Sequence, residues 1–109
     1  MLKRHNRSLG KKGGVQMDKK SIKQAIIDRV ESSKTVDYSA WRVGLTHNPS
    51  ERKEQHKSDG KSTKYWKQWV ADSLSDAEDI ESYFINTKGM KGGTGGDLNA
   101  RKTVYVYIL

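Results

Sequence analysis

Hydrophobic positions recur with a helical period in two segments of the chain. In residues 19–33 apolar side chains return every three to four positions, opposite Lys, Asp and Arg, and Asp18 stands where a helix cap is expected. A second amphipathic helix is expected from Ser75, which forms a capping box with Glu78. The buried side of this second helix is predicted to consist of Ala77, Ile80, Phe84 and Ile85.

Three other segments are typical of strands. Residues 36–46, 64–73 and 103–109 are rich in aromatic and β-branched side chains, and in the first two apolar and polar positions alternate. A strand over residues 36–46 would have one face with Tyr38, Ala40 and Arg42 and another with Trp41, Val43 and Leu45.

A polar helix is predicted between the first two strands, over residues 47–58. Asn48 suits its N-cap, Pro49 its first turn, and Glu51 completes a capping box. The segment has no hydrophobic stripe. A helix that is polar all round lies on the surface or serves a polar site.

The order of these elements predicts an α+β fold. A chain of 109 residues fits one domain, which we expect over residues 18–109 as a small, mainly antiparallel three-stranded sheet flanked by helices. Residues 1–17 have no periodicity and are expected to form a basic disordered tail. Residues 87–97 are rich in glycine and indicate a flexible connection.

Charge favours a polyanion as partner. The formal net charge is +8, of which residues 1–16 carry five positive charges and no acid. A tail that only aids solubility remains an alternative explanation of this excess. The absence of cysteine excludes disulfides and thiolate chemistry. No apolar run approaches the roughly 20 residues of a membrane span, and no signal peptide is evident, so a cytoplasmic setting without a membrane partner is expected.

Glu81 breaks the pattern of its helix. It shares a helical face with Ala77 and Phe84, where a carboxylate loses hydration unless a cation or a donor meets it. It can be an edge residue that reaches water or pairs with a lysine. It can also be a ligand of Mg²⁺, which proteins hold with a carboxylate, waters and phosphate oxygens.

Arg52 and His56 form a second candidate group on the polar helix. They are four residues apart and therefore share one face. Arginine can bind a phosphate with two hydrogen bonds, and histidine can transfer protons near neutral pH. The alternative is an ordinary solvated helix face.

Cations and aromatic side chains alternate in residues 61–69. Aromatic rings stack on bases and cations contact phosphates, so the segment is a candidate nucleic-acid contact. A half-buried strand with solvated lysines explains the same pattern. The candidate contact residues are Lys61, Lys64, Trp66 and Lys67.

These pieces together resemble the GIY-YIG nuclease family over residues 36–109. Residues 42–46 stand where that family has its Tyr-Ile-Gly strand, and they are followed by a pattern similar to the family's Gly-x-Thr, Arg and His. Ala77 and Glu81 are similar to the helix that carries the family's metal-binding glutamate. Residues 104–109 look like the family's opening strand, which here comes last in the chain.

The resemblance implies a metal-dependent DNA endonuclease with one Mg²⁺ or Mn²⁺ ion held by Glu81. It implies that Arg52 stabilises charge on the scissile phosphate, that Tyr107 lies near the attacking water and that His56 assists. Arg42 departs from the family by replacing the second-motif tyrosine, and it can act on the phosphate or the water.

The resemblance also makes a spatial prediction. The last strand must lie beside residues 41–46 and bring the phenol, a guanidinium and the carboxylate together. The alternatives are a non-catalytic nucleic-acid-binding module on the same scaffold and a protein-binding adaptor that uses Trp66 or Trp69.

Overall fold

The strand that comes last in the chain lies inside the sheet. β4 pairs antiparallel with β2 on one side and with β3 on the other, and β1 pairs parallel with the far side of β3, which gives the order β1-β3-β4-β2. The strands are β1 (Gln16–Met17), β2 (Val43–Thr46), β3 (Lys67–Ala71) and β4 (Tyr105–Ile108). The structure is a computed structural model that describes residues 16–34, 36–92 and 98–109.

The α+β class and the pairing of β4 with β2 are as predicted, whereas the number of strands is not. The predicted three-stranded sheet is a four-stranded mixed sheet, because Gln16 and Met17 form β1. The basic tail therefore does not extend to residue 17, and the domain begins earlier than residue 18. Residues 1–15 lie outside the described residues.

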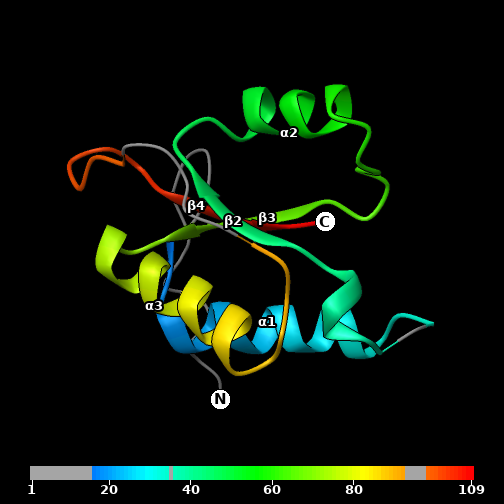
Figure 1. Cartoon of the computed structure of the whole chain (residues 1–109). Coiled ribbons are helices and arrows are strands. Elements are labelled where there is room, and N and C mark those ends of the chain that lie inside the picture. The colour runs from blue at the N-terminus through cyan, green and yellow to red at the C-terminus, as the bar shows by residue number, and fades with distance from the viewer. Residues whose placement is uncertain (1–15, 35, 93–97) are drawn as a thin grey trace, which may run out of the picture.

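Helices α1 and α3 cover one face of the sheet, and α2 lies over the other (Figure 1). The helix bounds are Lys19–Glu31 for α1, Pro49–Ser58 for α2 and Leu74–Asn86 for α3. The face under α1 and α3 holds the hydrophobic core, to which β2 and β4 contribute Val43, Leu45, Val106 and Ile108.

Helix α1 forms as its sequence predicts. The Asp18 carboxylate accepts a hydrogen bond from the Ser21 backbone N–H at 2.8 Å and caps the first turn. Ile22, Ile26 and Val30 are fully buried, one turn apart. The helix ends at Glu31, two residues before the predicted end.

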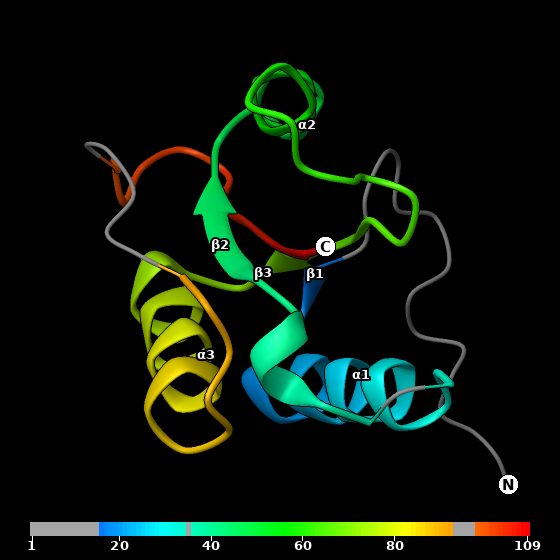
Figure 2. The same cartoon turned by 45° about the vertical axis from the view of Figure 1, so that its right-hand side comes forward.

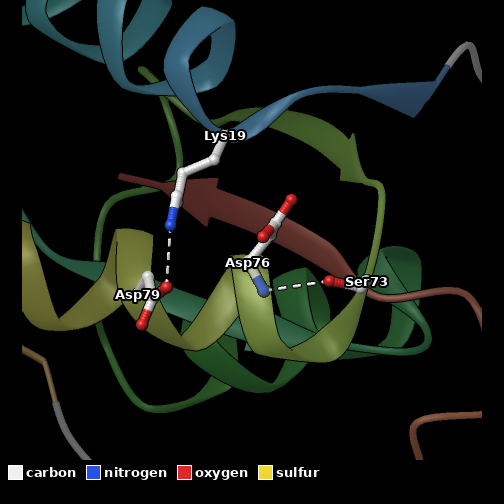
Figure 3. Close-up of polar contacts among 4 residues, drawn as sticks. All are labelled: Lys19, Ser73, Asp76 and Asp79. Carbon is white, nitrogen blue, oxygen red and sulfur yellow. Dashed lines mark hydrogen bonds and ion pairs between the residues drawn. The ribbon is translucent and has the colours of Figure 1, made fainter.

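Helix α3 begins earlier than predicted. Its cap is Ser73, whose hydroxyl accepts a hydrogen bond from the Asp76 backbone N–H at 3.0 Å, so Ser75 lies inside the first turn (Figure 3). Figure 3 also shows Lys19, at the start of α1, paired with Asp79 of α3 at 2.8 Å. Of the four positions predicted to be buried, three are fully buried: Ala77, Ile80 and Phe84. The fourth, Ile85, is half-buried.

The segment predicted as one long strand over residues 36–46 is divided. Tyr38–Ala40 form a short 3-10 helix because the Asp37 carboxylate accepts a hydrogen bond from the Ser39 backbone N–H at 3.0 Å. The regular strand starts only at Val43. The predicted alternation of faces therefore holds only for the last residues of the segment.

Helix α2 is polar and stands apart from the hydrophobic core (Figure 2). Asn48 caps it as predicted by accepting a hydrogen bond from the Glu51 backbone N–H at 3.1 Å. His56 is its one buried residue. In the part of the chain that the structure describes, no helix has the length and apolar character needed to cross a membrane.

Candidate functional site

The phenol of Tyr107 is the centre of the candidate site. In the sheet Tyr107 is opposite Gly44 of β2 and Gln68 of β3. Val106 and Ile108 point into the core, so the alternation along β4 directs Tyr107 to the α2 face. Tyr107 is 4% exposed. Gly44 is necessary at its position because a Cβ there would overlap the Tyr107 hydroxyl and ring.

His56 of α2 binds the Tyr107 hydroxyl. Its Nε2 lies 2.8 Å from the phenolic oxygen, and the side chain is 8% exposed. Burial lowers the pKa of His56, and the positive charges of Lys61, Arg52 and Arg42 lower it further. His56 is therefore held neutral, and the phenol can donate its proton to an unprotonated Nε2.

Trp66 packs on the same phenol. Its ring is stacked on Tyr107 with centroids 4.5 Å apart and planes 9° from parallel. The indole Nε1–H donates to the Gln68 side-chain oxygen at 2.7 Å. Trp66 was predicted as a nucleic-acid contact, and the structure places one face of its ring against Tyr107, a candidate catalytic side chain.

Two guanidinium groups act on the phenol. Arg42 and Arg52 both favour ionised Tyr107, although burial dominates and raises the pKa of this tyrosine. Neither guanidinium forms a hydrogen bond or ion pair within the described residues. Both side chains are partly buried. An unpaired, partly buried guanidinium is well suited to bind an anion with two hydrogen bonds.

The carboxylate of Glu81 belongs to α3, which covers the opposite face of the sheet from α2 (Figure 1). Burial raises the pKa of Glu81 to about 7, with a further contribution from Glu78. The charge of Glu81 also raises the pKa of Tyr107. The charge effect on Tyr107 is thus the observation that links the Glu81 carboxylate to the phenol.

Among the described residues, two buried side-chain polar atoms have no hydrogen-bond partner. They are Nδ1 of His56 and Oε2 of Glu81. Buried polar atoms in proteins are nearly always hydrogen-bonded, and an exception calls for a missing partner. Both atoms belong to residues that the sequence singles out for chemistry, one on α2 and one on α3.

His56 contacts Tyr107 directly, the charges of Arg42, Arg52 and Glu81 act on the same phenol, and the predicted nucleic-acid contact residues do not all share its face. Lys61 is near His56 and also lies 3.9 Å from Asp59. Lys64 lies over the Tyr65 ring at 5.5 Å. Lys67 is opposite Ile108, so its position in the strand belongs to the core face and not to the Tyr107 face. The predicted nucleic-acid contact residues are therefore divided between the two faces of the sheet.

Sequence reasoning missed three residues that build the site. Gly44 and Gln68 flank Tyr107 in the sheet, and a glycine within a strand is a readable signal of close approach. His47 holds the segment that leads into β4. Its Nδ1 lies 2.8 Å from the Thr103 carbonyl oxygen, and its Nε2 accepts a hydrogen bond from the Asn99 backbone N–H at 2.8 Å.

One protein carboxylate is available for a metal ion. The described residues contain no group of three or more His, Cys, Asp or Glu side chains that could hold one. The unpaired Oε2 of Glu81 nevertheless fits Mg²⁺, which proteins often bind through one or two carboxylates while waters and substrate phosphates complete the octahedron. A closed zinc or calcium cage does not fit this donor set.

Comparisons with protein-family models, with curated proteins and with solved structures gave no match. The function must therefore be inferred from the chemistry around Tyr107. His56 is hydrogen-bonded to this phenol, and the charges of Arg42, Arg52 and Glu81 act on it.

Proposed function

We propose that the chain is a metal-dependent endonuclease that hydrolyses phosphodiester bonds in DNA, with a GIY-YIG-like arrangement in which the first-motif strand comes last. The observation that carries the proposal is the His56–Tyr107 hydrogen bond on a phenol that also feels the charges of Arg42, Arg52 and Glu81. The strand order supports it as well. Because β4 lies between β3 and β2, the end of the chain comes under α2, the helix that carries Arg52.

The two arginines would bind the scissile phosphate. Arg52 and Arg42 have no competing partner within the described residues, so their donors are available to phosphate oxygens. Their positive charge would stabilise the additional negative charge that develops as water attacks phosphorus. Arg42 in place of a second tyrosine makes this site more cationic than the ordinary family pattern.

Glu81 would hold the metal ion, which supplies Lewis-acid stabilisation of the phosphate when bound. A carboxyl group with a pKa of about 7 is only partly ionised at neutral pH. A nearby cation favours the ionised form, so metal affinity and deprotonation of Glu81 should be coupled.

Tyr107 and His56 would move the proton of the attacking water. Neutral His56 can accept the phenolic proton at Nε2 while the Tyr107 oxygen accepts a proton from water. The hydroxide oxygen then bonds to phosphorus, and the bond to the leaving sugar oxygen breaks. The leaving oxygen takes a proton from a solvent water, and protonated His56 returns its extra proton to the resulting hydroxide, which balances the reaction.

DNA is proposed as substrate on the basis of charge. The formal net charge of +8 favours a polyanion, and release of counterions should make binding sensitive to salt. Lys61, next to His56, can extend contact along the backbone beyond the scissile phosphate. The cytoplasmic setting stays a prediction.

The test is nicking of supercoiled plasmid DNA with Mg²⁺ or Mn²⁺. Wild type should relax the plasmid, chelation should stop the reaction, and Glu81→Gln should lower the rate by about 10²-fold or more. Glu78→Gln is the matched control, since Glu78 is an exposed acid one turn earlier on α3. At pH 8 this control should stay within about threefold of wild type.

A non-catalytic nucleic-acid-binding module is the second candidate. It is favoured by the single carboxylate of the site and by Arg42 at the place of a tyrosine. In that case wild type binds DNA with an affinity that falls with salt, no metal produces nicks, and Glu81→Gln binds as tightly as wild type.

A further inference from the structure

The Trp66 side chain is engaged at the site. One face of the indole is stacked on Tyr107 with centroids 4.5 Å apart. Trp66 also lies near the His56 imidazole, with ring centroids 6.4 Å apart. The side chain is partly buried. One face of the indole is therefore occupied by the candidate catalytic phenol.

A closed set of contacts fixes the indole. Gln68 is the register partner of Tyr107 across β3 and β4. The Gln68 side-chain oxygen accepts the indole N–H of Trp66 at 2.7 Å, and the indole in turn stacks on Tyr107. The contacts thus form a closed loop that begins and ends at Tyr107.

The Tyr107 hydroxyl is consequently held from several sides. His56 binds it at 2.8 Å, Gly44 leaves the space into which it extends, and Trp66 restrains the ring. Offset stacking of aromatic rings has a preferred geometry, so it restricts rotation of the phenol more than an aliphatic contact would.

We propose that Trp66, anchored by Gln68, is a positioning residue that keeps the Tyr107 hydroxyl in place against His56 for the hydrolysis. This role rests on the proposed function, because it matters for catalysis only if Tyr107 takes part. The positioning itself is a property of the folded chain and can be measured without any activity. The expected effect on the cleavage rate is large, because a small displacement of a reacting group lowers the rate strongly.

The test compares three variants with wild type. Trp66→Leu removes the stack, Trp66→Phe retains an aromatic ring, and Gln68→Leu removes the acceptor of the indole N–H. The control is Tyr65→Leu, at the neighbouring aromatic residue, which is 55% exposed and whose ring lies beside Trp41. Circular dichroism and thermal unfolding establish that each variant is folded.

Two measurements are made on each protein. The first is the single-turnover cleavage rate together with the dissociation constant for a DNA duplex in Ca²⁺. The second is the titration of Tyr107 by NMR of ring-labelled tyrosine, with its signal assigned by its absence in Tyr107→Phe. The second measurement needs neither substrate nor metal.

In Trp66→Leu we expect the cleavage rate to fall by about tenfold or more, while the dissociation constant changes by less than about twofold. Trp66→Phe should recover most of the rate, and Gln68→Leu should show a smaller loss. The Tyr107 titration should move toward the ordinary value in Trp66→Leu, because the phenol loses part of its cover. Tyr65→Leu should match wild type in both measurements.

Two results would overturn the positioning role. One is a Trp66→Leu protein that binds DNA several-fold more weakly while its Tyr107 titration is unchanged, which would make Trp66 a base-stacking residue. The other is an unchanged rate, affinity and titration. If wild type has no nuclease activity, the proposed function fails, and the Tyr107 titration still decides whether Trp66 fixes the phenol.

Discussion

Gly44 and Tyr107 are directly opposite each other on β2 and β4, and the missing side chain of one makes room for the phenol of the other. Any Cβ at position 44 would overlap the hydroxyl end of the ring. The site therefore depends on a glycine that carries no chemistry itself.

Gly44→Ala should destabilise the fold by about 1–3 kcal/mol, because it forces the buried Tyr107 ring to move. Denaturant unfolding of a double-mutant cycle checks the cause. In a Tyr107→Leu background, Gly44→Ala should lower the free energy of unfolding by only a small fraction of the loss it causes in wild type. Equal costs in the two backgrounds would contradict the proposed clash.

Glu81 should make stability depend on pH. Its pKa is about 7 in the folded chain and near the ordinary 4.5 when unfolded, so the folded state prefers the neutral acid. The unfolding free energy of wild type relative to Glu81→Gln should thus be constant below pH 4.5 and fall by about 1–3 kcal/mol as the pH rises to 7. Above pH 7 it should be constant again.

Urea titrations at pH 4, 5, 6, 7 and 8 measure this difference. The lowered pKa of His56 produces the opposite trend, with stability gained as the pH rises, but it is common to both proteins and cancels in the comparison. A difference that does not change with pH would show that Glu81 is not buried in its neutral form.

The two arginines should matter for function and little for stability. Arg52→Ala and Arg42→Ala remove no hydrogen bond or ion pair within the described residues, so each should change the unfolding free energy by about 0.5 kcal/mol or less. Each should lower the cleavage rate by about 10²-fold.

Arg101→Ala serves as the control for lost charge, since Arg101 is exposed and outside the site. It should weaken DNA binding only slightly and leave the rate of the bound complex unchanged. A loss of several kcal/mol in either site variant would instead assign the two guanidiniums a structural role.

His47→Ala should loosen the segment that leads into β4. The variant loses the hydrogen bonds to the Thr103 carbonyl and from the Asn99 N–H, and a stability loss of about 1–2 kcal/mol is expected. Amide exchange should accelerate at Asn99 and Val104. Unchanged amide exchange at both positions would show that the two His47 hydrogen bonds do not stabilise this segment.

The sequence predicted those parts of the fold that depend on local pattern. The stripe of α1 and the Asn48 cap of α2 are readable from spacing alone, and both form. Two serines compete to cap α3, and Ser73 is the one used, which places the partly buried Leu74 in the first turn. Strand β1 has only two residues, too few to produce a periodic signal.

The candidate site was predictable as a set of residues but not as a set of contacts. Arg52 and His56 follow from helical spacing, and Tyr107 from the resemblance of its strand. The stacking of Trp66 on Tyr107 depends on the conformation of the connection before β3, which sequence pattern does not determine. The unpaired atoms of His56 and Glu81 emerge only from three-dimensional packing.

The position of β4 between β2 and β3 also governs how the sheet can assemble. β2 and β3 do not pair with each other, and apart from β4 only the two-residue β1 pairs with β3, so most of the ladder waits until β4, at residues 105–108, inserts between β2 and β3. Its contacts with β2 span about sixty residues of chain, and such distant pairings slow folding. The sheet should therefore form in one cooperative step, and a half-built intermediate would expose two open strand edges to aggregation.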